Sequence, residues 1–255
     1  NWGALFAIIT MILLTGFLAF RTHIKHKNKN KEEAKKTSDS IFEEGDNLLE
    51  SCTNNVVSSL NHVNDYYNTI LKGLIIEDRK GLKQVNKDIE ILNQAVKDLK
   101  DNIPLAIAHL PSESVETGHY YIQELDYLRE VAHCLTFIAK PAFKHVDNNH
   151  KALVKAQAAE VTNLASRIDG FVKKMQDLIL TKDFAKLNAI INEQQDILSL
   201  TDQYRKIQLK RLKSEVVGTR NSLLYISLLH ETRNLLLHMV NLIKAHRDFV
   251  LNQLD

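Results

Sequence analysis

Residues 124–135, ELDYLREVAHCL, carry the pattern that decides the fold. Four apolar side chains recur there every three or four positions, which is the spacing of the buried face of an α-helix: Leu125, Leu128, Ala132 and Leu135. Three ionisable side chains lie beside that apolar stripe: Asp126, Glu130 and His133. The stretch therefore predicts a helix that packs against other helices and carries two acids and a histidine next to its buried face.

Apolar stripes of the same spacing continue along the chain in both directions. Only eight glycines and three prolines interrupt the 255 residues, so long helices are favoured over a sheet, which needs many turns. Six long helical segments are expected, at residues 49–73, 82–103, 115–146, 151–180, 183–213 and 219–251. The sequence therefore predicts an all-α protein.

The order of three helices occurs twice along the chain. A shift of 104 residues superposes comparable points of the third helix of each set: Leu125 on Leu229, Val131 on Leu235, Lys140 on Lys244 and Val146 on Val250. Long helices joined by short loops pack as antiparallel bundles. We therefore expect two tandem three-helix bundles, at residues 41–148 and 149–255.

A different pattern precedes these bundles. Residues 2–20 contain no charged side chain, and a run of this length spans the hydrocarbon core of a bilayer as a helix. Residues 21–31, RTHIKHKNKNK, follow with five basic side chains, and basic flanks stay on the cytoplasmic side. We expect a transmembrane helix at residues 1–22, a basic linker at residues 23–40, and location at the inner cell membrane with the chain after about residue 22 in the cytoplasm.

Composition and motifs narrow the possible functions. The net charge is only +2 and basic and acidic residues are interleaved, so a nucleic-acid partner is not expected. No Gly-rich phosphate loop occurs, and no Ser/His/Asp or Cys/His spacing suggests a nucleophile with its base, so the chain is not expected to be an enzyme. A role in binding and control remains.

The duplicated three-helix unit with an acid-x-x-x-acid motif on its third helix, here Asp126 to Glu130, resembles PhoU, the family that regulates bacterial phosphate uptake. Two further stretches, FIAKPAFKHVDNNHKAL at 137–153 and LLHETRNLLLHMVNLIKAHRDFV at 228–250, follow an apolar segment and a basic linker. In that order they are similar to the C-terminal end of bacterial Na/Pi cotransporter family proteins.

The resemblance implies a PhoU-like regulatory region of a sodium-dependent phosphate transporter, a symporter. The helix at residues 1–22 would then be the last of a membrane domain that lies mostly upstream of Asn1. The implied partners are the membrane, the transporter's own membrane domain and further copies of the chain in a homo-oligomer. Control of phosphate uptake would pass through contacts of the helix bundle, without catalysis.

The resemblance also implies a metal site, because PhoU proteins hold metal ions on such acid pairs. Asp126 and Glu130 lie four residues apart and are neighbours on a helix, whereas His133 lies roughly 10 Å of helix rise from Asp126. A complete site for a divalent or transition-metal ion therefore needs groups from another helix, with His62 and Asp65 as candidates. The alternative is a solvated helix edge where Glu130 pairs with nearby cations.

The second set of helices does not repeat the acid pair. The positions matching Asp126 and Glu130 are His230 and Asn234. The segment HETRN at 230–234 is also similar to the phospho-acceptor box of sensor histidine kinases. A membrane-anchored helical signalling or scaffold protein of the histidine-kinase or chemoreceptor type therefore stays open as the alternative function.

Overall fold

The computed structural model describes residues 48–108 and 115–254, which are helical with no strand among them. The elements are α2 (Leu48–Ile75), α3 (Arg79–Asp101), α4 (Ile103–Ala108), α5 (Val115–Asp147), α6 (Lys155–Thr181), the 3-10 turn η1 (Phe184–Lys186), α7 (Leu187–Lys213) and α8 (Thr219–Leu254). The prediction of an all-α protein is confirmed over this part of the chain.

The expected transmembrane helix at residues 1–22 and the basic linker at residues 23–40 lie outside the described residues, as do the first residues of the bundle expected from residue 41. Within the described ranges, none of the helices combines the length and the apolar character that crossing a bilayer requires.

Local chemistry explains where α2 ends and α3 begins. α2 runs two residues past Gly73, where the sequence suggested its end, and the chain turns at Glu77 with a φ of 56°. Gly73 instead permits close packing, because a Cβ there would lie 3.0 Å from Cγ of Leu82 on α3. Asp78 caps α3 by accepting a hydrogen bond from the backbone N–H of Gly81 at 3.0 Å.

Proline does not end the third helix. Pro141 lies inside α5, and its ring nitrogen has no hydrogen to donate to the preceding turn. The helix continues to Asp147 because Ala142 and Val146 beyond the proline are buried. The chain then turns at Asn149, which has a left-handed φ of 51°. Asparagine tolerates that conformation better than most residues, which explains the position of the turn.

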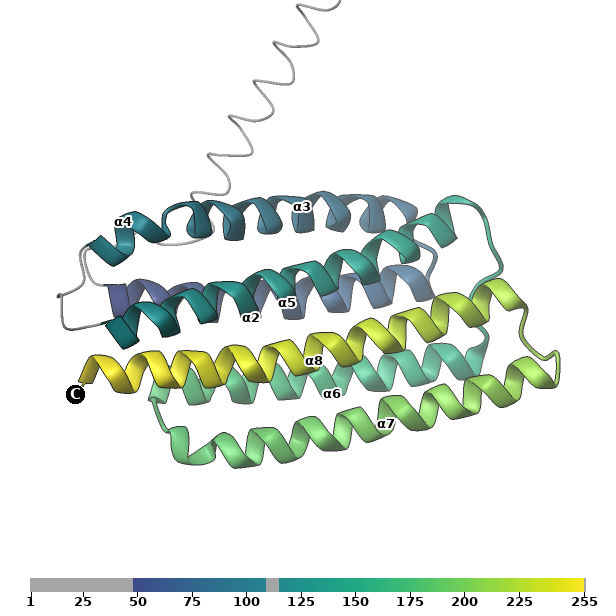
Figure 1. Cartoon of the computed structure of the whole chain (residues 1–255). Coiled ribbons are helices and arrows are strands. Elements are labelled where there is room, and N and C mark those ends of the chain that lie inside the picture. Colours follow the sequence, from purple (N-terminus) through teal and green to yellow (C-terminus); the bar gives the residue numbers. More distant parts are fainter. Residues whose placement is uncertain (1–47, 109–114, 255) are drawn as a thin grey trace, which may run out of the picture.

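The six long helices form two sets of three that share one interior. In Figure 1, α3 lies at one edge of the bundle, α7 lies at the other, and α2, α5, α6 and α8 lie between them. The contact of α5 with α8 is the most extensive in the molecule, and α2 packs on α6. The colours in Figure 1 show that α5 and α8 run in opposite directions, as do α2 and α6. The first helices of the two sets therefore pair with each other, and so do the third helices.

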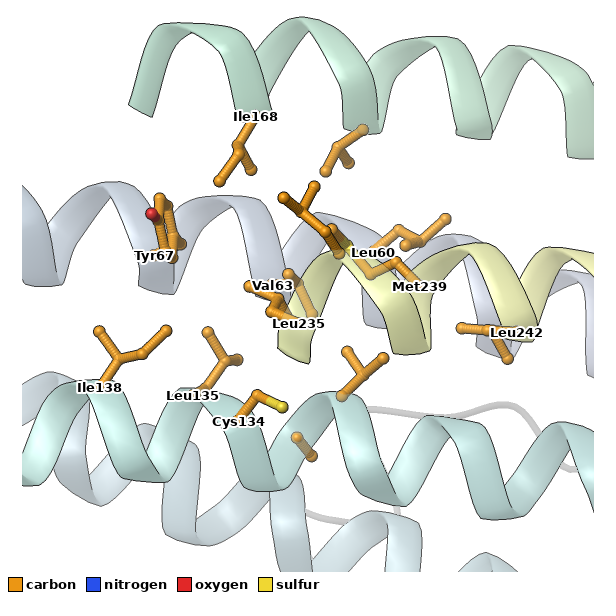
Figure 2. Packing of buried hydrophobic residues seen from close by; sticks show 14 of the residues in the cluster. Leu60, Val63, Tyr67, Cys134, Leu135, Ile138, Ile168, Leu235, Met239 and Leu242 are labelled. Atoms are coloured by element: carbon orange, nitrogen blue, oxygen red, sulfur yellow. The ribbon is translucent and has the colours of Figure 1, made fainter. Parts of the chain in front are cut away.

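One hydrophobic core contains residues from both sets. Figure 2 shows side chains of four helices meeting between the ribbons: Leu60, Val63 and Tyr67 of α2, Leu135 and Ile138 of α5, Ile168 of α6, and Leu235, Met239 and Leu242 of α8. Hydrogen bonds also join the sets. The Tyr67 hydroxyl of α2 lies 2.8 Å from the Thr232 hydroxyl of α8, and the Asn64 side chain of α2 donates to Asp169 of α6 at 2.7 Å. The buried side chains of the two sets therefore belong to one continuous cluster.

The repeated order extends to individual buried positions. The shift of 104 residues relates buried pairs in the first and third helices, including Leu60 with Leu164, Tyr67 with Phe171, Leu125 with Leu229 and Leu135 with Met239. In the middle helices the shift is one residue longer, and it relates Leu82 to Leu187, Val85 to Ile190 and Leu92 to Ile197. The burial pattern of one set thus recurs in the other.

Because α8 completes the core of the first set, shortening one of its central side chains should destabilise the whole bundle. Leu235 is fully buried, so Leu235→Ala is expected to lower the free energy of unfolding by roughly 2–5 kcal/mol. Leu223 on the same helix is 63% exposed, and Leu223→Ala should change the free energy of unfolding by less than about 0.5 kcal/mol. Urea unfolding followed by circular dichroism measures both; equal effects would contradict the packing.

Candidate functional site

The predicted acid pair on α5, Asp126 and Glu130, forms ion pairs with basic side chains of the protein itself. Asp126 is half exposed and forms an ion pair with Lys100 of α3, whose Nζ lies 2.5 Å from Oδ1. Glu130 accepts a hydrogen bond from Nη2 of Arg129 at 2.8 Å, and this bond holds the pKa of Glu130 below its usual value. The two carboxylates are engaged by different partners.

His133 lies near Glu130 on α5 and lines the groove between α3 and α5. The His133 ring is exposed and contacts Phe137 edge-on, with 6.2 Å between ring centres. His238 of α8 also lies near Glu130, and the two histidines add to the lowering of the Glu130 pKa that Arg129 causes. Glu130 thus lies near a histidine of its own helix and a histidine of α8, whereas Asp126 pairs with α3.

The two residues suggested as further ligands lie on α2. His62 is half buried and stacks on Tyr66, and burial lowers the His62 pKa although nearby Asp65 opposes this. Asp65 is exposed. Within the described residues, no hydrogen bond or ion pair joins His62 or Asp65 to the predicted acid pair of α5.

Among residues 48–108 and 115–254, no group of three His, Cys, Asp or Glu side chains is able to hold a metal ion. The metal site of Asp126, Glu130 and His133, with His62 and Asp65, stays a prediction. Metal content of the purified protein before and after Asp126→Ala/Glu130→Ala tests it, and equal content in both would remove it.

Sequence reasoning missed a buried ionisable pair between α5 and α8. Glu124 and His246 both have side chains with 0% exposed area, and Oε2 of Glu124 lies 3.0 Å from Nδ1 of His246. Their other polar atoms, Oε1 of Glu124 and Nε2 of His246, are buried without a hydrogen-bond partner among the described residues. An unsatisfied buried polar group costs about 1–3 kcal/mol, so these two atoms lower the stability of the folded protein.

A thiol from a third helix completes the cluster. Cys52 of α2 lies beside Glu124, and burial raises the pKa of its thiol well above the ordinary value, with the Glu124 carboxylate raising it further. The thiol therefore stays protonated near neutral pH, which disfavours a nucleophilic role. The cluster therefore brings a carboxyl group, an imidazole and a thiol together in a site closed to solvent.

A second polar network ties α6, α7 and α8 together. Glu160 accepts two hydrogen bonds from Arg211, at 2.6 and 2.8 Å, and one from the Tyr225 hydroxyl at 2.5 Å. Its members are mutually paired, and the Glu160 and Arg211 side chains are only 13% and 16% exposed. A bidentate pair with this geometry holds helices in position and leaves no atom of Glu160 free.

A sequence signal for the buried pair did exist. Glu124 stands four residues before Leu128 and seven before Val131, so it shares their buried helix face. His246 stands four residues after Leu242 and has the same relation to the core of α8. An ionisable residue on the apolar stripe, rather than beside it, marks a buried charge that requires a partner.

The chain has no match among protein-family models, among curated proteins or among solved structures. The interpretation of these sites therefore rests on their geometry and chemistry.

The Glu124–His246 pair should show strong coupling between its members. Glu124→Leu or His246→Leu alone leaves a buried polar partner unsatisfied, so each is expected to destabilise the protein by about 2 kcal/mol. The double substitution removes both polar groups, and its stability should return close to that of the wild type. Urea unfolding measures all three variants; simple additivity of the two single losses would show that the side chains do not interact.

Proposed function

We propose that the chain is the PhoU-like regulatory region of a sodium-dependent phosphate transporter. In this proposal a helix at residues 1–22 belongs to the membrane domain, and the two three-helix sets lie on the cytoplasmic side of the inner membrane. The helix bundle controls phosphate uptake by contact with the membrane domain and by assembly with further copies, without catalysis.

The observation that supports this proposal most is the duplication. A three-helix unit that occurs twice is what the resemblance to PhoU implies, and the order of the helices and their buried positions recur between the two sets over the described residues. The apolar run at residues 2–20 with its basic flank supports the placement at a membrane.

The α3–α5 face offers a surface for such contact. Two adjoining grooves between these helices share Glu90 and Lys140 among their lining residues. Five lysines line them without a hydrogen-bond or ion-pair partner within the described residues: Lys83, Lys87, Lys97, Lys140 and Lys144. The exposed Phe137 lies among them. A lysine-rich strip with an apolar residue suits an acidic surface of the membrane domain or its lipid headgroups.

One observation favours the alternative, a membrane-anchored signalling or scaffold protein of the histidine-kinase or chemoreceptor type. His230, the histidine of the HETRN segment, is exposed on α8, as a phospho-acceptor must be. Acid-labile phosphate on the wild-type protein, absent from His230→Gln, would favour that function over transport control.

The proposal predicts that the α3–α5 lysines act in transport. In cells that carry the complete gene, Lys83→Glu/Lys87→Glu/Lys140→Glu should change sodium-dependent phosphate uptake in the same direction as deletion of residues 48–255. Reversed charges repel the acidic partner surface, whereas Lys206→Glu on exposed α7 should leave uptake as in the wild type. Uptake of labelled phosphate, normalised to protein abundance, is the measurement.

Two results would contradict the proposal. If deletion of residues 48–255 leaves sodium-dependent phosphate uptake unchanged at low and high external phosphate, the chain does not control this transport. If a chain lacking residues 1–22 remains in the membrane fraction after a high-salt wash, the helix at these residues is not what holds the protein there.

A further inference from the structure

The groove between α7 and α8 contains cationic side chains that have weak ion-pair partners or none among the described residues. Arg205 of α7 and His230 and Arg233 of α8 line it, together with Asp202, while Ile226 and Leu229 supply apolar lining. Arg233 is half buried and has no hydrogen-bond or ion-pair partner among the described residues. A partly desolvated guanidinium without an anion is unfavourable, so the groove is incomplete without a ligand.

Among the described residues, Asp202 is the one acid that lines this groove, and it holds Arg205 weakly. Nη2 of Arg205 lies 3.3 Å from Oδ1 of Asp202, and the two side chains are 53% and 44% exposed. An exposed pair with this geometry contributes little to stability and exchanges readily for a better partner. Two guanidinium groups thus face one carboxylate, and the groove carries excess positive charge even with His230 neutral.

Comparison with the first set of helices shows what has changed. Arg129 stands at the position equivalent to Arg233, and it is hydrogen-bonded to Glu130. Lys100 stands at the position equivalent to Arg205, and it pairs with Asp126. At the positions of these two acids the second set has His230 and Asn234. With both acids replaced, Arg233 has no hydrogen-bond or ion-pair partner among the described residues, and Arg205 keeps the weak pair with Asp202.

The donor set indicates the class of ligand. Guanidinium groups present planar forks of N–H donors that match pairs of oxygens on phosphate or carboxylate. Two forks and an imidazole N–H supply more donors than the two oxygens of one carboxylate accept well, whereas a tetrahedral phosphate has enough oxygens and carries up to two negative charges. Apolar lining from Ile226 and Leu229 lowers the local dielectric constant and strengthens the attraction.

We propose that the α7–α8 groove binds a phosphate-type oxyanion between Arg205, His230 and Arg233. The anion is either free inorganic phosphate or the phosphate group of a larger molecule such as an anionic lipid. The inference stands on the chemistry of the groove and goes beyond the proposed function. If both hold, phosphate bound here would act directly on the bundle that controls uptake.

Isothermal titration of the purified full chain with inorganic phosphate, at constant ionic strength set with chloride, tests the proposal. Arg205→Ala and Arg233→Ala should each weaken binding roughly tenfold, because each removes charge-assisted hydrogen bonds. Asp202→Asn should strengthen binding severalfold, since it removes the competing carboxylate. Arg129→Ala is the matched control, because it removes the same charge from the equivalent position, and it should change binding by less than about twofold.

A second arm distinguishes the sources of the anion. Soluble dihexanoyl phosphatidic acid replaces phosphate in the same titrations, and binding of this lipid alone, with the same dependence on Arg205 and Arg233, would support the headgroup form. Binding of neither probe, or equal weakening by Arg129→Ala and Arg233→Ala, would overturn the proposal. The direction of the Asp202→Asn effect keeps the test valid if an arginine variant folds poorly. Unchanged phosphate uptake after deletion of residues 48–255 would instead count against the transport role and not against phosphate binding.

Discussion

The antiparallel contact between α5 and α8 is the interaction on which the rest of the structure depends. Each of these helices is the third of its set, and each buries its apolar face partly against the other. Leu128, Leu135, Leu235 and Met239 have no exposed area there, and a buried side chain of this size contributes about 1.5–3 kcal/mol. A three-helix set separated from its partner would expose these side chains to water. The two sets are therefore one cooperative structure in which a duplicated sequence supplies both sides of a single core.

The contact between α5 and α8 also contains buried polar side chains. Glu124 and His246 lie fully buried within it, and His238 of α8 lies close enough to Glu130 of α5 to help lower the Glu130 pKa. Both helices contribute to the Glu124–His246 pair, so a substitution of either side chain acts on both sets at once. The junction thus supplies stability and also a place where one set can influence the other.

Sequence periodicity predicted the helices well because it reports directly which positions are buried. The stripe at 82–103 corresponds to α3, which ends at Asp101, and the stretch 115–146 corresponds to α5. Periodicity does not report which helix covers each stripe, so the shared core and the pairing of α5 with α8 were not predicted. Gly73 shows a related limit, because a tertiary contact gave the glycine a packing role where the sequence suggested the end of the helix.

The candidate site was predicted less completely, for a comparable reason. The spacing of Asp126 and Glu130 placed both on one helix face, but Lys100, which pairs with Asp126, comes from another helix. Such partners depend on the approach of helices, which spacing along one helix does not contain. Glu124 and His246 were missed because candidate site residues were sought beside the apolar stripe and not on the buried faces themselves, where an ionisable residue requires a partner.

Native-state hydrogen exchange tests most directly whether the two sets form one cooperative unit. Leu164 is fully buried in α6, and Leu164→Ala in the second set should lower the protection of the slowest amides of α3 and α8 by the same free energy. That result is expected because both sets open together in global unfolding. Loss of protection confined to α6, α7 and α8, with the amides of α2, α3 and α5 unchanged, would show two independent bundles and contradict the account.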